Sequence, residues 1–206
     1  MTYIFAYYLR EGSSDDGLLK IIYATLIDCG FSSDSFITPL PYPTGTKTLT
    51  SGLNAILKLG DIPVFIHRDS DNESRDKRIQ EIKNARSSTG FTALTIPVIP
   101  VRETEAWLLY ALHNSDFRQR VGVPESITLP SRQTCETIAA KEKLKEIYNS
   151  VINQFPSKRR SKNAESFAKV RSRWLEALDD IKFVEGCQSF EDFRKECINA
   201  YKNKNS

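Results

Sequence analysis

The 206-residue sequence is poor in the side chains that hold soft metal ions. It has only two histidines, His67 and His113, and its four cysteines are scattered without a Cys-x-x-Cys pair. This pattern excludes a zincin helix and a His-Cys finger, and it argues against a zinc ribbon and a dithiol redox motif. If the chain uses a metal, carboxylate oxygens must hold it, which favours hard ions such as Mg²⁺ or Mn²⁺.

Long apolar stretches are also missing. No run approaches the roughly 18 residues that a membrane-spanning helix needs. The N-terminal stretch lacks a basic region and reaches acidic residues early, so we expect no signal peptide. We therefore expect no membrane association and a cytoplasmic protein with reduced cysteines. Hydrophobic residues at 40% and charged residues at 27% are typical of a globular protein with one core.

Two common catalytic motifs are absent. Residues 45–48 read Gly-Thr-Lys-Thr, which lacks the spacing and the Gly-Lys pair of a phosphate-binding Walker loop. No G-x-S-x-G sequence occurs, so Ser13 and Ser14 do not form a nucleophile elbow. ATP hydrolysis, if the function needs it, is expected from a partner protein.

Apolar stretches alternate with helical patterns over residues 1–124. We predict strands at 3–9, 36–40, 62–66 and 92–101, and helices at 13–28, 50–59, 72–88 and 103–112. The first helix is expected to begin at Ser13, which would form a capping box with Asp16. Such alternation is typical of βαβ units, so we predict an α/β, Rossmann-like domain with a mainly parallel four-stranded sheet flanked by helices.

Residues 125–206 have a different character. The pattern after Pro130 is purely helical, with helices predicted at about 134–153, 163–181 and 189–202. This part is mildly basic, with 16 lysines and arginines against 12 acids, whereas residues 1–124 have 13 against 14. We predict a C-terminal helical extension that packs on the α/β domain.

Acidic residues follow three of the predicted strands. In chain order they are Glu11 with Asp15 and Asp16, Asp69 with Asp71, and Glu103 with Glu105. The carboxyl ends of neighbouring parallel strands lie at one edge of a sheet, where ligands bind. Carboxylates gathered there repel one another unless a cation intervenes. We predict a Mg²⁺ or Mn²⁺ site with candidate ligands Glu11, Asp15, Asp69, Asp71, Glu103 and Glu105.

Each acidic group also has a simpler interpretation. Asp15 could offset the dipole of the helix that follows it. Asp69 and Asp71 could form a turn and a helix cap, and Glu103 and Glu105 could simply begin a helix. The same strand-end position of all three groups favours the metal site over three separate structural roles.

Cationic side chains lie beside the acids in sequence. Arg68 and Arg102 could contact phosphate or transition-state charge, and they could equally form salt bridges with the acids. His67 could carry a proton, although a lone histidine at a strand end is more often structural. A basic run at 158–160 suits phosphate contact and also fits a solvated loop. The predicted nucleic-acid contacts are Lys47, Arg102, Lys158, Arg159 and Arg160.

The motif order resembles the TOPRIM fold of topoisomerases, primases and OLD-type nucleases. A strand followed by Glu11-Gly12-x-x-Asp15 and a helix, and then a strand followed by Asp69-x-Asp71, carries this resemblance. The stretch Glu103-x-Glu105-Ala106-Trp107-Leu108-Leu109 is similar to small TOPRIM-related proteins found near ATPases in anti-phage defence loci. The resemblance covers about residues 1–112, and the helical tail more loosely.

The resemblance implies a Mg²⁺-dependent nuclease. Glu11 would act near the scissile phosphate as metal ligand or general acid/base, and Asp69 and Asp71 would ligate Mg²⁺. Arg68 is added to the catalytic candidates because it lies beside the acids in the sequence, not because of the resemblance. Further acids would serve a second metal, and the candidates are Asp15, Glu103 and Glu105. A strand-passing topoisomerase or a complete primase is disfavoured, because those proteins carry a catalytic tyrosine or long flanking domains.

The same resemblance implies partners. Nucleic acid is the expected substrate, with DNA favoured over RNA, and an ATPase is the expected partner protein; a homo-oligomer is possible. Two alternatives stay open. The chain could be a non-catalytic TOPRIM-like interaction or regulatory subunit, or it could transfer phosphoryl groups on a nucleotide instead of a polymer.

Overall fold

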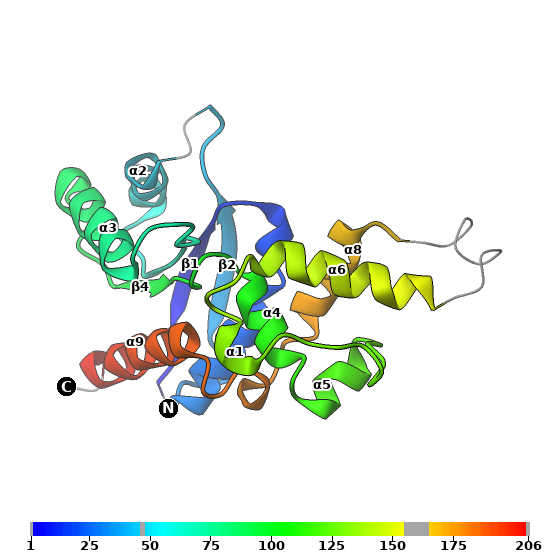
Figure 1. Ribbon diagram of the computed structural model, residues 1–206. Coiled ribbons are helices and arrows are strands. Elements are labelled where there is room, and N and C mark those ends of the chain that lie inside the picture. Colours follow the sequence, from blue (N-terminus) through cyan, green and yellow to red (C-terminus); the bar gives the residue numbers. More distant parts are fainter. Residues whose placement is uncertain (1, 46–47, 155–164, 205–206) are drawn as a thin grey trace.

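A four-stranded parallel sheet organises the chain. The computed structural model describes residues 2–45, 48–154 and 165–204 (Figure 1). The sheet has the order β2-β1-β3-β4, and all neighbouring strands are parallel. Its strands are β1 (Phe5–Arg10), β2 (Phe36–Pro41), β3 (Val64–His67) and β4 (Thr95–Val98). The predicted α/β fold with a parallel four-stranded sheet is therefore confirmed.

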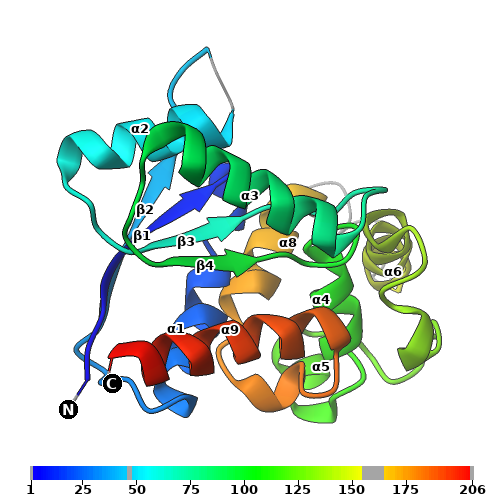
Figure 2. The ribbon, with the colours of Figure 1, turned by 90° about the vertical axis from the view of Figure 1, so that its left-hand side faces the viewer.

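Two layers of helices cover the sheet (Figure 2). Helices α2 (Leu49–Leu59) and α3 (Arg75–Thr89) lie on one face, and α1 (Leu18–Asp28) lies on the other. Side chains alternate between the faces because successive strand residues point in opposite directions. Leu9 and Ile66 join the α2–α3 side of the core, whereas Tyr8 and Phe65 join the α1 side.

The helices after β4 complete the α1 side of the sheet. They are α4 (Glu105–Ala111), α5 (Ser115–Arg120), α6 (Ala140–Asn153), α8 (Phe167–Glu176) and α9 (Gln188–Lys204). Helix α6 packs on α4, α8 packs on α1, and α9 packs on β4. None of the helices among the described residues combines the length and apolar character needed to cross a bilayer.

A single apolar core joins the sheet to the C-terminal helices. The buried Trp107 ring of α4 lies 6.1 Å from the Phe193 ring of α9, which lies 6.5 Å from the Phe65 ring of β3. The Trp107 indole also donates a hydrogen bond of 2.8 Å to the Ser189 hydroxyl in the first turn of α9. Helix α9 thus packs directly on the sheet, while the division into two domains stays a prediction.

Two predicted helix starts are wrong for local reasons. Ser13 makes no capping hydrogen bond; residues Ser13–Asp15 form a 3₁₀ turn, and α1 begins at Leu18. The Tyr8 hydroxyl holds this turn by donating to the Asp15 carbonyl at 3.2 Å. Helix α3 begins at Arg75 and not at 72, because the Ser74 side chain accepts a hydrogen bond from the Lys77 amide and caps the helix there.

Candidate active site

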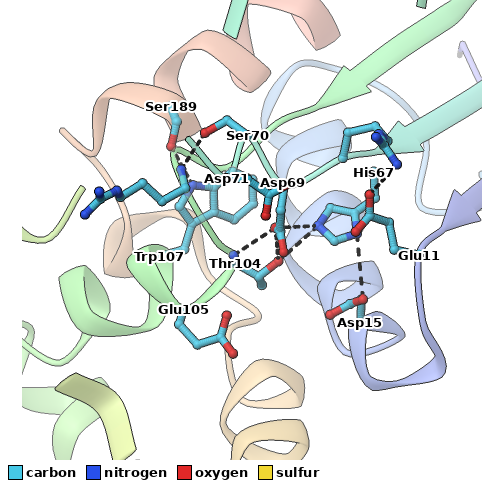
Figure 3. A network of polar contacts seen from close by, with 12 residues as sticks. Glu11, Asp15, His67, Asp69, Ser70, Asp71, Thr104, Glu105, Trp107 and Ser189 are labelled. Carbon is cyan, nitrogen blue, oxygen red and sulfur yellow. Dashed lines mark hydrogen bonds and ion pairs between the residues drawn. The ribbon is translucent and has the colours of Figure 1, made fainter. Parts of the chain in front are cut away.

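The candidate site lies where β1, β3 and β4 end (Figure 3). Glu11 follows β1, Asp69 and Asp71 follow β3, and Glu103 follows β4. Because these strands are neighbours, their following loops share one edge of the sheet. The structure therefore brings together loops that lie up to 92 residues apart in the sequence.

Asp69 is held by a buried histidine and a threonine. The His67 Nε2 atom lies 3.0 Å from the Thr104 Oγ1 atom and 3.3 Å from the Asp69 Oδ1 atom. Thr104 donates to the same Asp69 oxygen from its amide and its hydroxyl, both at 3.0 Å. His67 points to the α1 side of the sheet, as Phe65 does, and is fully buried. Asp69 is thus fixed in orientation by the last residue of β3 and by a residue of the loop after β4.

The charges of His67 and Asp69 support each other. Burial alone would lower the pKa of His67, but its hydrogen bond to Asp69 and the charges of Asp69, Asp15 and Glu11 outweigh burial and raise it. Burial would raise the pKa of Asp69, but the hydrogen bond and charge of His67, with the Thr104 bond, lower it. Each group therefore favours the charged form of the other, an imidazolium beside a carboxylate.

The two histidines are expected to titrate on opposite sides of pH 6.5. The pKa of His113 lies below that value because of partial burial and the nearby charge of Arg132, whereas the pKa of His67 lies above it. Nuclear magnetic resonance of the imidazole groups against pH, without added metal, measures both. The variant His113→Gln assigns the two signals. A His67 signal that titrates below that of His113 would contradict the network in Figure 3.

The same shifts set the pH range over which the pair stabilises the fold. The raised pKa of His67 means that its contribution is complete below about 6.5 and is lost as the pH rises through its folded value. The lowered pKa of Asp69 means that its contribution is present above about 3.8 and is lost as the pH falls through its folded value. Both contributions are present between these limits.

Glu11 is held by an arginine from the β3 loop. The Arg68 Nη1 atom donates to the Glu11 Oε1 atom at 2.6 Å, and Arg68 Nη2 lies 3.7 Å from the Glu81 Oε2 atom of α3. Burial raises the pKa of Glu11, although the Arg68 charge opposes this effect. The charges of Asp69 and Asp71 also raise the pKa of Glu11, so both of these carboxylates lie within electrostatic reach of Glu11.

Asp71 is presented by an unusual loop. Asp71 and Arg102 are the non-glycine residues with positive φ angles in the described chain, at 54° and 60°. The Asp71 amide donates to the Arg102 carbonyl at 2.7 Å, and the Arg102 amide donates to the Ser70 hydroxyl at 2.5 Å. These bonds join the loops after β3 and β4. The exposed Asp71 carboxylate accepts a hydrogen bond of 2.8 Å from Arg78.

Asp15 and Glu105 face the interior. Arg171 of α8 donates to the Asp15 Oδ1 atom at 3.0 Å and to the Glu105 Oε1 atom at 2.6 Å. Asp15 is 7% exposed, and Glu105 is 2% exposed. Both predicted metal ligands therefore already have a buried cationic partner. We therefore assign Asp15 and Glu105 a structural role beneath the site. The more accessible acids are the candidates for direct metal ligation.

The remaining predicted site residues lie at the margin or outside the described chain. Glu103 accepts a hydrogen bond of 3.1 Å from the Lys141 amide at the start of α6, and burial raises its pKa. Arg102 donates to the Thr137 carbonyl at 2.8 Å. Arg102 and Glu103 line a small cleft together with Asp71 and Glu142. Four predicted nucleic-acid contacts, Lys47, Lys158, Arg159 and Arg160, lie outside the described residues.

The accessible acids have the right chemistry for a hard cation. Among the described residues, no group of three or more His, Cys, Asp or Glu side chains is arranged as a ready-made metal site. Glu11, Asp69 and Asp71 nevertheless supply oxygen ligands from adjacent strand ends, with side chains 34%, 21% and 64% exposed. A cation among them would offset their mutual repulsion, provided that Glu11 and Asp71 turn from their arginines.

Sequence reasoning missed two residues that shape this site. Thr104 lies between two acids in the sequence, but its role depends on the pairing of β3 with β4, which no local pattern shows. Arg171 lies 156 residues from Asp15, and only the packing of α8 on α1 brings the two together.

Comparisons with protein-family models, curated proteins and solved structures give no significant match to this chain.

Proposed function

We propose that this chain is a Mg²⁺- or Mn²⁺-dependent nuclease of the TOPRIM type that hydrolyses phosphodiester bonds. The observation that carries the proposal is the edge formed by Glu11, Asp69 and Asp71, which follow two adjacent strands and of which Asp69 and Asp71 lie within electrostatic reach of Glu11. Carboxylates gathered at one edge repel one another, and a divalent metal is the cation that such a set of oxygen ligands favours.

Glu11, Asp69 and Asp71 would hold the metal. A bound Mg²⁺ supplies charge to activate a water molecule and to stabilise the leaving oxygen. The chain's own residues do the rest. Thr104 and His67 keep the Asp69 carboxylate oriented and ionised. Arg68, once released from Glu11, contacts a phosphate oxygen.

The expected substrate is a nucleic acid, with DNA favoured over RNA. Arg68, Arg78 and Arg102 lie around the acids, and such cations reduce the repulsion between a polyanion and an acidic edge. The resemblance of the sequence to TOPRIM-related proteins adds an ATPase partner and a place in bacterial anti-phage defence to the proposal. Both belong to the proposal through that resemblance alone.

A cleavage assay tests the proposal. Supercoiled plasmid DNA and a structured RNA are incubated with the chain and with Mg²⁺, Mn²⁺ or a chelator. We expect nicking or linearisation that requires the metal and disappears in the double variant Glu11→Ala/Asp69→Ala. Equal cleavage by the wild type and the double variant would sink the proposal, because it would assign the activity to a contaminant.

A non-catalytic interaction subunit is the second candidate. The arginine partners of Glu11 and Asp71 favour it, since these ion pairs already neutralise part of the acidic edge. Calorimetry with Mn²⁺ separates the two candidates when it is combined with the assay. Binding of Mn²⁺ together with cleavage supports the nuclease. Absence of cleavage, both by the chain alone and in the presence of an ATPase partner, supports the interaction subunit.

A further inference from the structure

Arg171 joins the C-terminal helices to the edge that carries the acids. Its guanidinium donates to the Glu105 carboxylate at 2.6 Å, to the Asp15 carboxylate at 3.0 Å and to the Ser14 carbonyl at 3.0 Å. Arg171 is 8% exposed, so these contacts are shielded from solvent. A planar guanidinium suits this arrangement, because its N–H groups point to several acceptors at once.

Two chains of contacts run from Arg171 to the same oxygen of Asp69. Through the first, the Asp15 Oδ2 atom lies 3.9 Å from His67 Nδ1, and His67 Nε2 lies 3.3 Å from Asp69 Oδ1. Through the second, Glu105 begins α4 directly after Thr104, which donates to Asp69 Oδ1 from its amide and its hydroxyl. The contacts of Arg171 with Asp15 and Glu105 are therefore connected to Asp69 by two separate routes.

We propose that Arg171 is a positioning residue that orients Asp69 through the Asp15–His67 and Glu105–Thr104 contacts. Helix α8 is then part of the functional unit and not an appendage to it. The inference rests on the proposed function in one respect, namely that Asp69 is a metal ligand. A salt bridge that only stabilised the fold would leave Asp69 oriented after its removal, provided that the protein remained folded.

The test uses a variant that removes the buried charges together. Asp15→Asn/Glu105→Gln/Arg171→Met keeps the side chains close in size and leaves no unpaired ion. The matched control is Glu165→Gln/Arg173→Met, which removes an exposed ion pair between a residue just before α8 and its last turn. The melting of each variant, followed by circular dichroism, establishes that it is folded under the conditions of the measurements.

Hydrogen exchange of the Thr104 amide is the first readout. If Arg171 only stabilised the fold, the exchange rate of Thr104 relative to a reference amide would not change in a folded variant. This amide donates to Asp69, whereas the Arg68 amide donates to the Val98 carbonyl in the adjoining strand pair and serves as the internal reference. We expect the exchange of Thr104 relative to Arg68 to accelerate about tenfold or more in the triple variant, and to stay unchanged in the control.

Metal affinity gives the second readout. Loss of groups that orient a metal ligand typically costs about 10- to 100-fold in affinity or activity, so Mn²⁺ binding by calorimetry and plasmid cleavage should both weaken by that factor. An unchanged Thr104 exchange ratio in a folded triple variant overturns the inference. If the wild type neither binds Mn²⁺ nor cleaves, the proposed nuclease fails, while the exchange ratio still decides whether Arg171 positions Asp69.

Arg171→Lys provides the same test should the triple variant not fold. Lysine keeps the charge but replaces the planar fork with a single ammonium group, which cannot reproduce all three contacts. We expect Arg171→Lys to accelerate Thr104 exchange relative to Arg68 and to weaken Mn²⁺ binding, each by less than about tenfold. Wild-type values for both would overturn the inference.

Discussion

Asp69→Asn is expected to lower the rate of metal-dependent cleavage by about 10³-fold and to leave the fold intact. Removing the negative charge of Asp69 removes the ligand that has the best-defined orientation at the edge. The reduction is comparable with the loss of one preorganised charge-stabilising group in other enzymes, which costs about 10²–10³-fold. Single-turnover cleavage of plasmid DNA at saturating Mg²⁺ measures it.

The fold should survive this change because asparagine keeps an acceptor oxygen. Its carbonyl can still receive the two Thr104 hydrogen bonds that Asp69 receives. The change removes one of the charges that raise the pKa of His67, so the imidazole becomes neutral at a lower pH. Circular dichroism melting and the His67 resonance therefore report separately on the fold and on the changed charge.

Neighbouring acids provide a graded comparison. Glu11→Gln should reduce cleavage by a similar factor, whereas Asp71→Asn should cost less, because the Asp71 side chain is the most exposed of the three. The matched control is Glu73→Gln, an exposed acid in the same loop that pairs with Lys77. A loss for Glu73→Gln as large as that for Asp69→Asn would show that the rate depends on the charge of the loop and not on a particular ligand.

Strand-end acids were the part of the site that the sequence could predict. The strands are short apolar stretches, and a parallel sheet places the loops after its strands at a common edge. Position in the chain was enough for Glu11, Asp69 and Asp71 because each follows its strand within four residues. The same reasoning could not separate acids that face solvent from acids that face the core.

That separation depends on long-range packing. Asp15 and Glu105 look like ligands in the sequence, yet each turns inward to Arg171, whose partners are fixed only when α8 packs on α1. The short helix α5 was also missed; the Asn114 side chain caps it by accepting from two amides, but its six residues are too few to show a helical pattern. Local patterns predicted the elements, and packing decided the roles.

Arg171→Met is expected to lower the free energy of unfolding by about 3–5 kcal/mol, the largest effect on stability that the site predicts. The substitution leaves Asp15 and Glu105 as buried carboxylates without their cation, and breaking a buried pair on one side carries a cost of about this size. Urea unfolding followed by circular dichroism at pH 7 measures it. Arg173→Met on the same helix is the control, because that exposed arginine and its partner should contribute less than about 1 kcal/mol.

Neutralising the acids should recover most of the lost stability. Adding Asp15→Asn and Glu105→Gln to Arg171→Met removes the uncompensated charges, and neutral replacements of buried ions are often no less stable than the ions themselves. The double-mutant cycles for the two pairs should therefore show strong coupling, which independent surface charges do not. Additive effects would mean that Arg171 stabilises the chain through packing alone. Strong coupling together with unimpaired Mn²⁺ binding by the triple variant would instead show that Arg171 stabilises the fold and would contradict its positioning role.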